Sequence, residues 1–213
     1  MGATRALRDL VRERWARRVE RTLQVGIAAM LVWGLASVNV NVVVNATAAL
    51  GVTLLPGVLE RDPRVRLGAG LTALVALAAF LHVAGMFGLY EALFWWDHLT
   101  HTLSAVLVAA TGYATVVALD EHSDVVSFPA EFTFVFVFLF TLALGVLWEV
   151  LEFAGREAAF VVGASPVLVQ YGLEDTLLDL VFDAVGALLL SVFGAGELQG
   201  LVGTFVERFR EPA

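Results

Sequence analysis

The chain contains no cysteine and no lysine. The lack of cysteine excludes disulfide bonds and thiolate metal ligands. The basic residues are 13 arginines against 21 acids, and the net charge of −8 argues against a nucleic-acid partner. The Arg-rich residues 1–21 also lack the apolar stretch of a cleavable signal peptide. An acidic, lysine-free composition rich in Ala, Val and Gly is the halophile-like composition of a GC-rich source.

Apolar residues dominate the amino-acid composition. They make up 59% of the chain, against roughly 45–50% in a soluble domain. A membrane-spanning helix needs about 20 mostly apolar residues. We therefore predict an all-α polytopic membrane bundle of about six transmembrane helices, at roughly 22–38, 41–59, 67–90, 94–119, 130–155 and 173–195. Asn39, Asn41 and Asn45 indicate a tight turn between the first two; the alternative is one broken helix and five spans.

The arginines predict the orientation of the bundle. Twelve of them fall on one side of a six-span arrangement, in residues 1–21, the 60–66 loop and the C-terminal tail, and only Arg156 falls on the other. Because cytoplasmic loops carry the excess of arginine, both termini are predicted to be cytoplasmic. The expected location is the plasma membrane, as a multi-pass protein with membrane lipids as partners.

Three regions follow from this pattern. Residues 1–21 are predicted to form a cytoplasmic amphipathic segment that lies on the anionic inner leaflet. Residues 22–196 form the transmembrane helical domain, and residues 197–213 form a cytoplasmic tail. No internal repeat or second domain is visible in the sequence.

Acids and histidines gather in three short segments: Trp96–His101, Trp148–Glu152 and Asp175–Asp183. Within each segment a polar residue recurs every three or four positions, which stacks the polar groups on one helix face. The predicted topology places all three segments in the outer half of the membrane. Asp183 would lie about 15 Å below the start of its helix, near the membrane midplane. Residues at that depth are not simple interface residues.

The charge of this set predicts a ligand. Six carboxylates cannot all remain ionised in a low dielectric without compensation from protons, water or a divalent cation. Mixed carboxylate and imidazole donors suit zinc, manganese or iron. We assign His101, Glu149, Asp179 and Asp183 as metal ligands. Asp97, His98 and Glu152 are the candidate catalytic residues, since an unligated carboxylate or histidine can move the proton.

Simpler interpretations remain open. Asp97 and Asp175 lie at helix starts, where acids favour the helix dipole. The whole set can be a structural polar network that fixes helix packing. The leading function is a metal-dependent hydrolase that acts on a lipid or envelope precursor at the outer leaflet. The alternatives are a proton- or cation-coupled transporter, with the same acids as carriers, and a non-catalytic membrane protein.

At these motifs the chain resembles a known family. The segments are Tyr90–His101 (YEALFWWDHLTH), Leu147–Phe153 (LWEVLEF), Gly172–Leu180 (GLEDTLLDL) and Asp183–Ala187 (DAVGA). Together they resemble the YjdF-type family of small polytopic membrane proteins. They are more distantly similar to VanZ-like proteins, which share an Asp-x-x-His, a later Glu and an Asp-x-x-x-(Asn/Asp)-x-x-Gly near the last helix. The resemblance implies a helical membrane fold but no particular reaction. One departure is Gly155-Arg156-Glu157, where an Asp is expected, and it leaves Arg156 outside the expected site.

Overall fold

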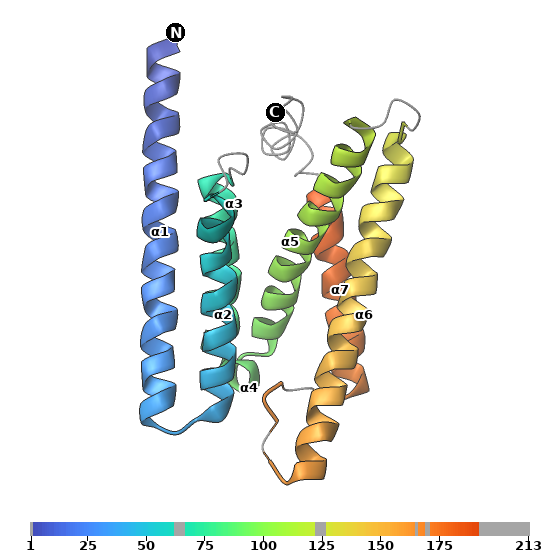
Figure 1. Ribbon diagram of the computed structural model, residues 1–213. Coiled ribbons are helices and arrows are strands. Elements are labelled where there is room, and N and C mark those ends of the chain that lie inside the picture. Colours follow the sequence, from blue (N-terminus) through green and yellow to red (C-terminus); the bar gives the residue numbers. More distant parts are fainter. Residues whose placement is uncertain (1, 62–66, 122–126, 165, 169–170, 192–213) are drawn as a thin grey trace. The chain divides into compact units, whose positions relative to one another are not determined.

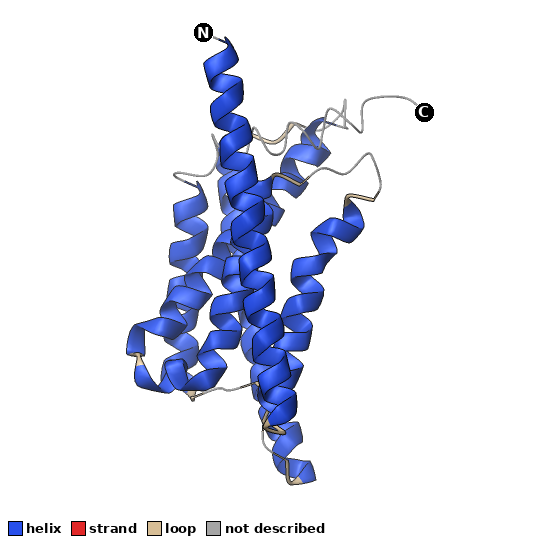
Figure 2. Cartoon of the chain, turned by 90° about the vertical axis from the view of Figure 1, so that its left-hand side faces the viewer, coloured by secondary structure: helices blue, strands red, loops and turns tan. Residues whose placement is uncertain are grey.

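The computed structural model describes residues 2–61, 67–121, 127–164, 166–168 and 171–191. No strand occurs in these residues, which form helices joined by turns and loops (Figure 2). Five of the helices are long and apolar enough to cross a membrane. The predicted all-α membrane bundle is therefore confirmed. The chain divides into two compact units, Met1–Leu89 and Tyr90–Ala213, which are described separately.

The first unit contains α1 (Gly2–Ala36), α2 (Val40–Leu59) and α3 (Ala69–Ala84). Its core is formed by four buried residues, Ile27, Ala46, Ala49 and Val83. The α1 helix is continuous, so no break separates the Arg-rich residues 1–21 from the first span. The assignment of residues 1–21 to the surface of the inner leaflet stays a prediction.

The first two spans are separate antiparallel helices and not one broken helix (Figure 1). Asn39 caps α2, because its side chain accepts a hydrogen bond from the backbone nitrogen of Val42 at 3.1 Å. The other two asparagines lie inside α2, where the Nδ2 of Asn45 donates to the Oδ1 of Asn41 at 2.9 Å. His82 on α3 lies 3.0 Å from the Oδ1 of Asn45, through its Nε2 atom. His82 thus belongs to a polar network of the first unit.

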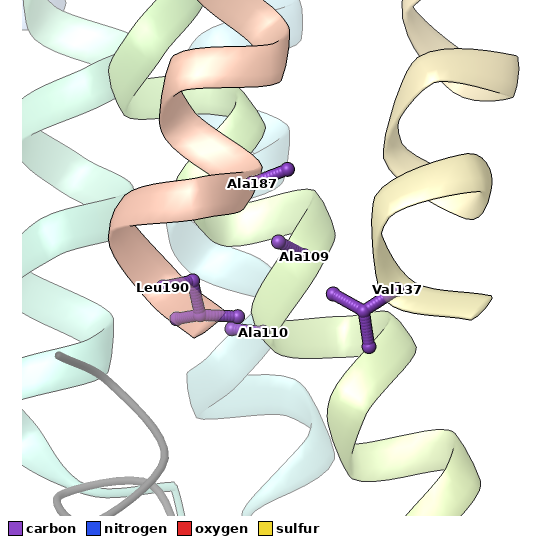
Figure 3. Packing of buried hydrophobic residues seen from close by; sticks show 5 residues of the cluster. All are labelled: Ala109, Ala110, Val137, Ala187 and Leu190. Carbon is purple, nitrogen blue, oxygen red and sulfur yellow. The ribbon is translucent and has the colours of Figure 1, made fainter. Parts of the chain in front are cut away.

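The second unit contains α4 (Tyr90–Ala92), α5 (Phe94–Glu121), α6 (Ala130–Val162) and α7 (Leu173–Leu189). The three long helices pack around a small apolar cluster (Figure 3), whose members are Ala109 and Ala110 on α5, Val137 on α6, and Ala187 and Leu190 from α7 and its end. Helices α5 and α7 approach closely at Gly186. A Cβ atom there would lie 2.6 Å from the Cβ of Ala105 and 2.6 Å from the backbone oxygen of Thr102.

Several predicted spans differ in length from the observed helices. The third, predicted at 67–90, corresponds to α3, which ends at Ala84. The α6 helix has 33 residues and runs to Val162, because nothing stops it before Gly163, whose φ of 69° ends it in the left-handed conformation. The described part of α7 has only 17 residues. The predicted sixth span extends to residue 195, and its last four positions lie outside the described residues.

The directions of α5 and α6 lead to a test of topology. These helices are antiparallel (Figure 1), so the last residues of α5 and of α6 lie at opposite ends of the unit. A reporter fused within residues 120–124 should read cytoplasmic, and one fused at Pro166 should read extracytoplasmic, because of the arginine distribution. Alkaline phosphatase and fluorescent-protein fusions measure this directly. The reverse pattern would contradict the predicted orientation.

Candidate metal centre

His101 is the centre of the polar site in the second unit. Asp97 and His101 are one helical turn apart on α5, so they share a face. The Nε2 atom of His101 lies 3.7 Å from the Oδ1 of Asp97 and 3.8 Å from the Oδ1 of Asp179 on α7. Asp97, His101 and Asp179 each offer one ligand atom, and these three atoms lie within 4.8 Å of one another. Such a group can hold a metal ion.

The other ring nitrogen of His101 has a separate partner. Its Nδ1 atom lies 3.3 Å from the Oδ1 of Asp183, one turn beyond Asp179 on the same helix. A neutral ring that donates its Nδ1 proton to Asp183 presents the Nε2 lone pair to Asp97 and Asp179. Histidine ligands of metals are commonly oriented by a carboxylate in this way. Space for Asp183 comes from Gly145 on α6, where a Cβ atom would collide with its Oδ2.

Burial raises the energetic cost of these acids. Asp179 is 1% exposed, and its Oδ1 has no hydrogen-bond partner among the described residues. A buried carboxylate that loses water without a hydrogen bond or a close counter-charge is strongly destabilising. The 3.8 Å separation from His101 is too long for a hydrogen bond. The unsatisfied oxygen therefore points to a cation or a proton at this position.

Two further acids come from α6. Glu149 and Glu152 are both buried, at 4% and 8% exposed. The Oε2 of Glu149 accepts a hydrogen bond from the Thr176 hydroxyl at 2.7 Å. The Oε1 of Glu152 accepts one from the indole Nε1 of Trp148 at 2.9 Å. Sequence reasoning missed both donors, although Trp148 precedes Glu152 by one turn and Thr176 precedes Asp179 by one turn.

The structure thus brings together six of the seven predicted site residues. They come from three helices: Asp97 and His101 from α5, Glu149 and Glu152 from α6, and Asp179 and Asp183 from α7. Asp97, Asp179 and Asp183 each have an oxygen within 3.8 Å of a ring nitrogen of His101. Glu149 and Glu152 are buried about one turn apart on α6, and Thr176 of α7 donates to Glu149. We call these six residues the acidic cluster. Their individual roles stay predictions.

His98, the seventh predicted site residue, packs on α7 beside the acidic cluster. Its ring stacks on Phe182 of α7, with centroids 4.2 Å apart and an interplanar angle of 7°. The Nδ1 atom of His98 is buried and has no hydrogen-bond partner among the described residues. Phe182 directly precedes Asp183 on α7, and His98 directly follows Asp97 on α5. Its acid–base role stays a prediction.

Asp175 and Tyr171 lie at the start of α7. The Oδ2 of Asp175 accepts a hydrogen bond from the backbone nitrogen of Tyr171 at 3.0 Å, which fits the capping interpretation. Partial burial raises the pKa of the Tyr171 hydroxyl, and the carboxylates of Glu91 and Asp97 add to this effect.

Comparison with known proteins assigns the chain to a family. Residues 19–199 match the profile of a family described as predicted membrane protein (DUF2238), and this range contains every residue of the acidic cluster. A Thermotoga maritima protein, described as an uncharacterized protein, is 29% identical over 133 residues, which cover 62% of this chain and 65% of that protein. No solved structure shows significant similarity to the chain. The protein is therefore a multi-pass membrane protein that belongs to the DUF2238 family.

Proposed function

We propose that the protein is a metal-dependent hydrolase that acts on a lipid or envelope precursor at the outer side of the plasma membrane. The observation that carries this proposal is the convergence of Asp97, His101 and Asp179, whose ligand atoms lie within 4.8 Å of one another. One imidazole and two carboxylates suit zinc, manganese or iron. We also propose a relationship to YjdF-type and VanZ-like proteins, because the motifs that resemble theirs contain these residues.

The geometry favours one change in the roles inferred from the sequence. Asp97 lies beside the Nε2 of His101 and serves as a metal ligand, whereas Asp183 lies beside Nδ1 and positions the ring. A metal held here would lower the pKa of a bound water and so supply a nucleophile. His98, whose buried Nδ1 has no hydrogen-bond partner among the described residues, would take up the proton that the water loses. It would return this proton to the leaving oxygen as the scissile bond breaks.

The first test of this proposal is elemental analysis of protein purified without chelator. Wild-type protein should contain at least one equivalent of zinc, manganese or iron. His101→Ala and Asp179→Asn should lose it, because each removes one of the three converging ligand atoms found in the described part of the chain. Glu174→Gln is the matched control, since Glu174 is an exposed acid on the same helix as Asp179.

Other outcomes separate the alternatives. Metal-free wild-type protein that binds no added divalent ion would refute the metalloenzyme. Stability that follows pH or a monovalent cation would then support proton- or cation-coupled transport. Variants that are neutral or more stable than the metal-free wild type would support a purely structural network, because they remove repulsion between acids.

A further inference from the structure

The two carboxylates of α6 share a pattern that the first metal position does not explain. Glu149 and Glu152 are three residues apart on one helix face, and each is more than nine-tenths buried. In each, one oxygen is held by a side-chain donor, Thr176 or Trp148. The other oxygen of Glu149, Oε1, is buried and has no hydrogen-bond partner among the described residues. A carboxylate that is held in place by one hydrogen bond, and whose other oxygen is buried without a partner, is positioned to bind a ligand.

The charge balance points to the nature of this ligand. A cation held by Asp97, His101 and Asp179 compensates two carboxylates, and Asp183 faces the ring of His101. Glu149 and Glu152 are two further buried acids, three residues apart on α6, that do not belong to this first position.

We propose that Glu149 and Glu152 bind a second divalent cation next to the first. This inference rests on the proposed metal centre and extends it to a two-cation site. The donors of the second position are carboxylate oxygens only, so it favours magnesium or manganese, whereas the imidazole of His101 suits the first position to zinc, manganese or iron. The hydrogen bonds from Thr176 and Trp148 orient the two carboxylates, as partners of ligating acids do in other metal sites.

Manganese serves as the probe because it fits both positions and is paramagnetic. Full-length protein in detergent, freed of metal and titrated with Mn²⁺, should bind two equivalents. Cations about 3.5–4 Å apart couple magnetically. The electron paramagnetic resonance spectrum should therefore lose the six-line signal of isolated Mn²⁺ as the second equivalent binds. Glu149→Gln, which keeps the side-chain volume and the bond from Thr176, should bind one equivalent and retain the isolated signal.

A second variant and a control variant test the proposed second cation position. Glu152→Gln is a second, independent variant and should behave as Glu149→Gln does. Glu157→Gln changes an exposed acid on the same helix and should still bind two coupled ions. Wild-type protein that binds a single Mn²⁺, with no change in Glu149→Gln, would overturn the second position and leave the proposed function intact. Wild-type protein that binds no Mn²⁺, zinc or iron would overturn both.

Discussion

Chelation should lower the melting temperature of the wild-type protein by about 5–10 °C. A ligand present at about 100 times its dissociation constant stabilises the folded state by about 2.7 kcal/mol, and each kcal/mol shifts the melting temperature by roughly 2–4 °C at this chain length. The physical cause is the charge of the acidic cluster: removal of the cation leaves buried carboxylates, including Asp179 at 1% exposed, without compensation. Differential scanning fluorimetry with and without chelator measures the shift.

Two variants make this result specific. Asp179→Asn should melt at one temperature with or without chelator, because it removes a ligand. Asp183→Asn should keep the effect but need about 10–100 times more metal, since it only loosens the orientation of His101. Glu174→Gln should respond as the wild type does. Equal melting temperatures of wild-type protein in chelator and in excess divalent metal would contradict the metal centre.

Gly186→Ala should destabilise the second unit by about 1–3 kcal/mol. The added Cβ would meet the Cβ of Ala105 and the backbone oxygen of Thr102, each at 2.6 Å. Small residues allow membrane helices to approach closely, and a backbone atom cannot move aside as a flexible side chain can. The α5 and α7 helices must therefore separate, which also moves Asp179 and Asp183 away from His101. The expected results are a lower melting temperature and weaker metal binding.

Gly155→Ala is the matched control for this substitution. It lies in a helix of the same unit, and its added Cβ would only make ordinary contacts with Leu168, at 3.7 and 3.9 Å. Alanine has a higher helix propensity than glycine, so this variant should be as stable as the wild type or slightly more stable. An equal effect of both substitutions would show that the close approach of α5 and α7 does not control stability.

The sequence predicted the fold class because long apolar runs leave few alternatives to membrane helices. It predicted helix ends less well. The α6 helix continues past the predicted limit of 155 to Val162, since Arg156 and Glu157 do not break a helix whereas Gly163 ends it. Asn41 and Asn45 resemble turn residues in the sequence but bond to each other within α2. Local composition could not distinguish such a pair from a turn.

The residues that lie together in the acidic cluster could be predicted from the sequence, but the contacts between individual side chains could not. The spacing of Asp97 and His101 places them on one face of α5, and the structure confirms that they lie together. Which acid faces which nitrogen of His101 depends on the rotation of α7 against α5, which is determined by contacts such as Gly186. The donors Trp148 and Thr176 carry no charge, so a search for acids and histidines passed over them.

The composition of α7 has a consequence for the order in which the protein is made. This helix has 17 described residues, and Asp179 and Asp183 flank its centre. An aspartate at the centre of a membrane helix opposes insertion by the translocon by about 2.5–3.5 kcal/mol. As an isolated segment α7 would enter the bilayer poorly. Because α5 and α6 precede α7 in the chain, they are synthesised first and can already be in the membrane when α7 leaves the ribosome. We expect α7 to insert by packing against their polar faces, which completes the acidic cluster.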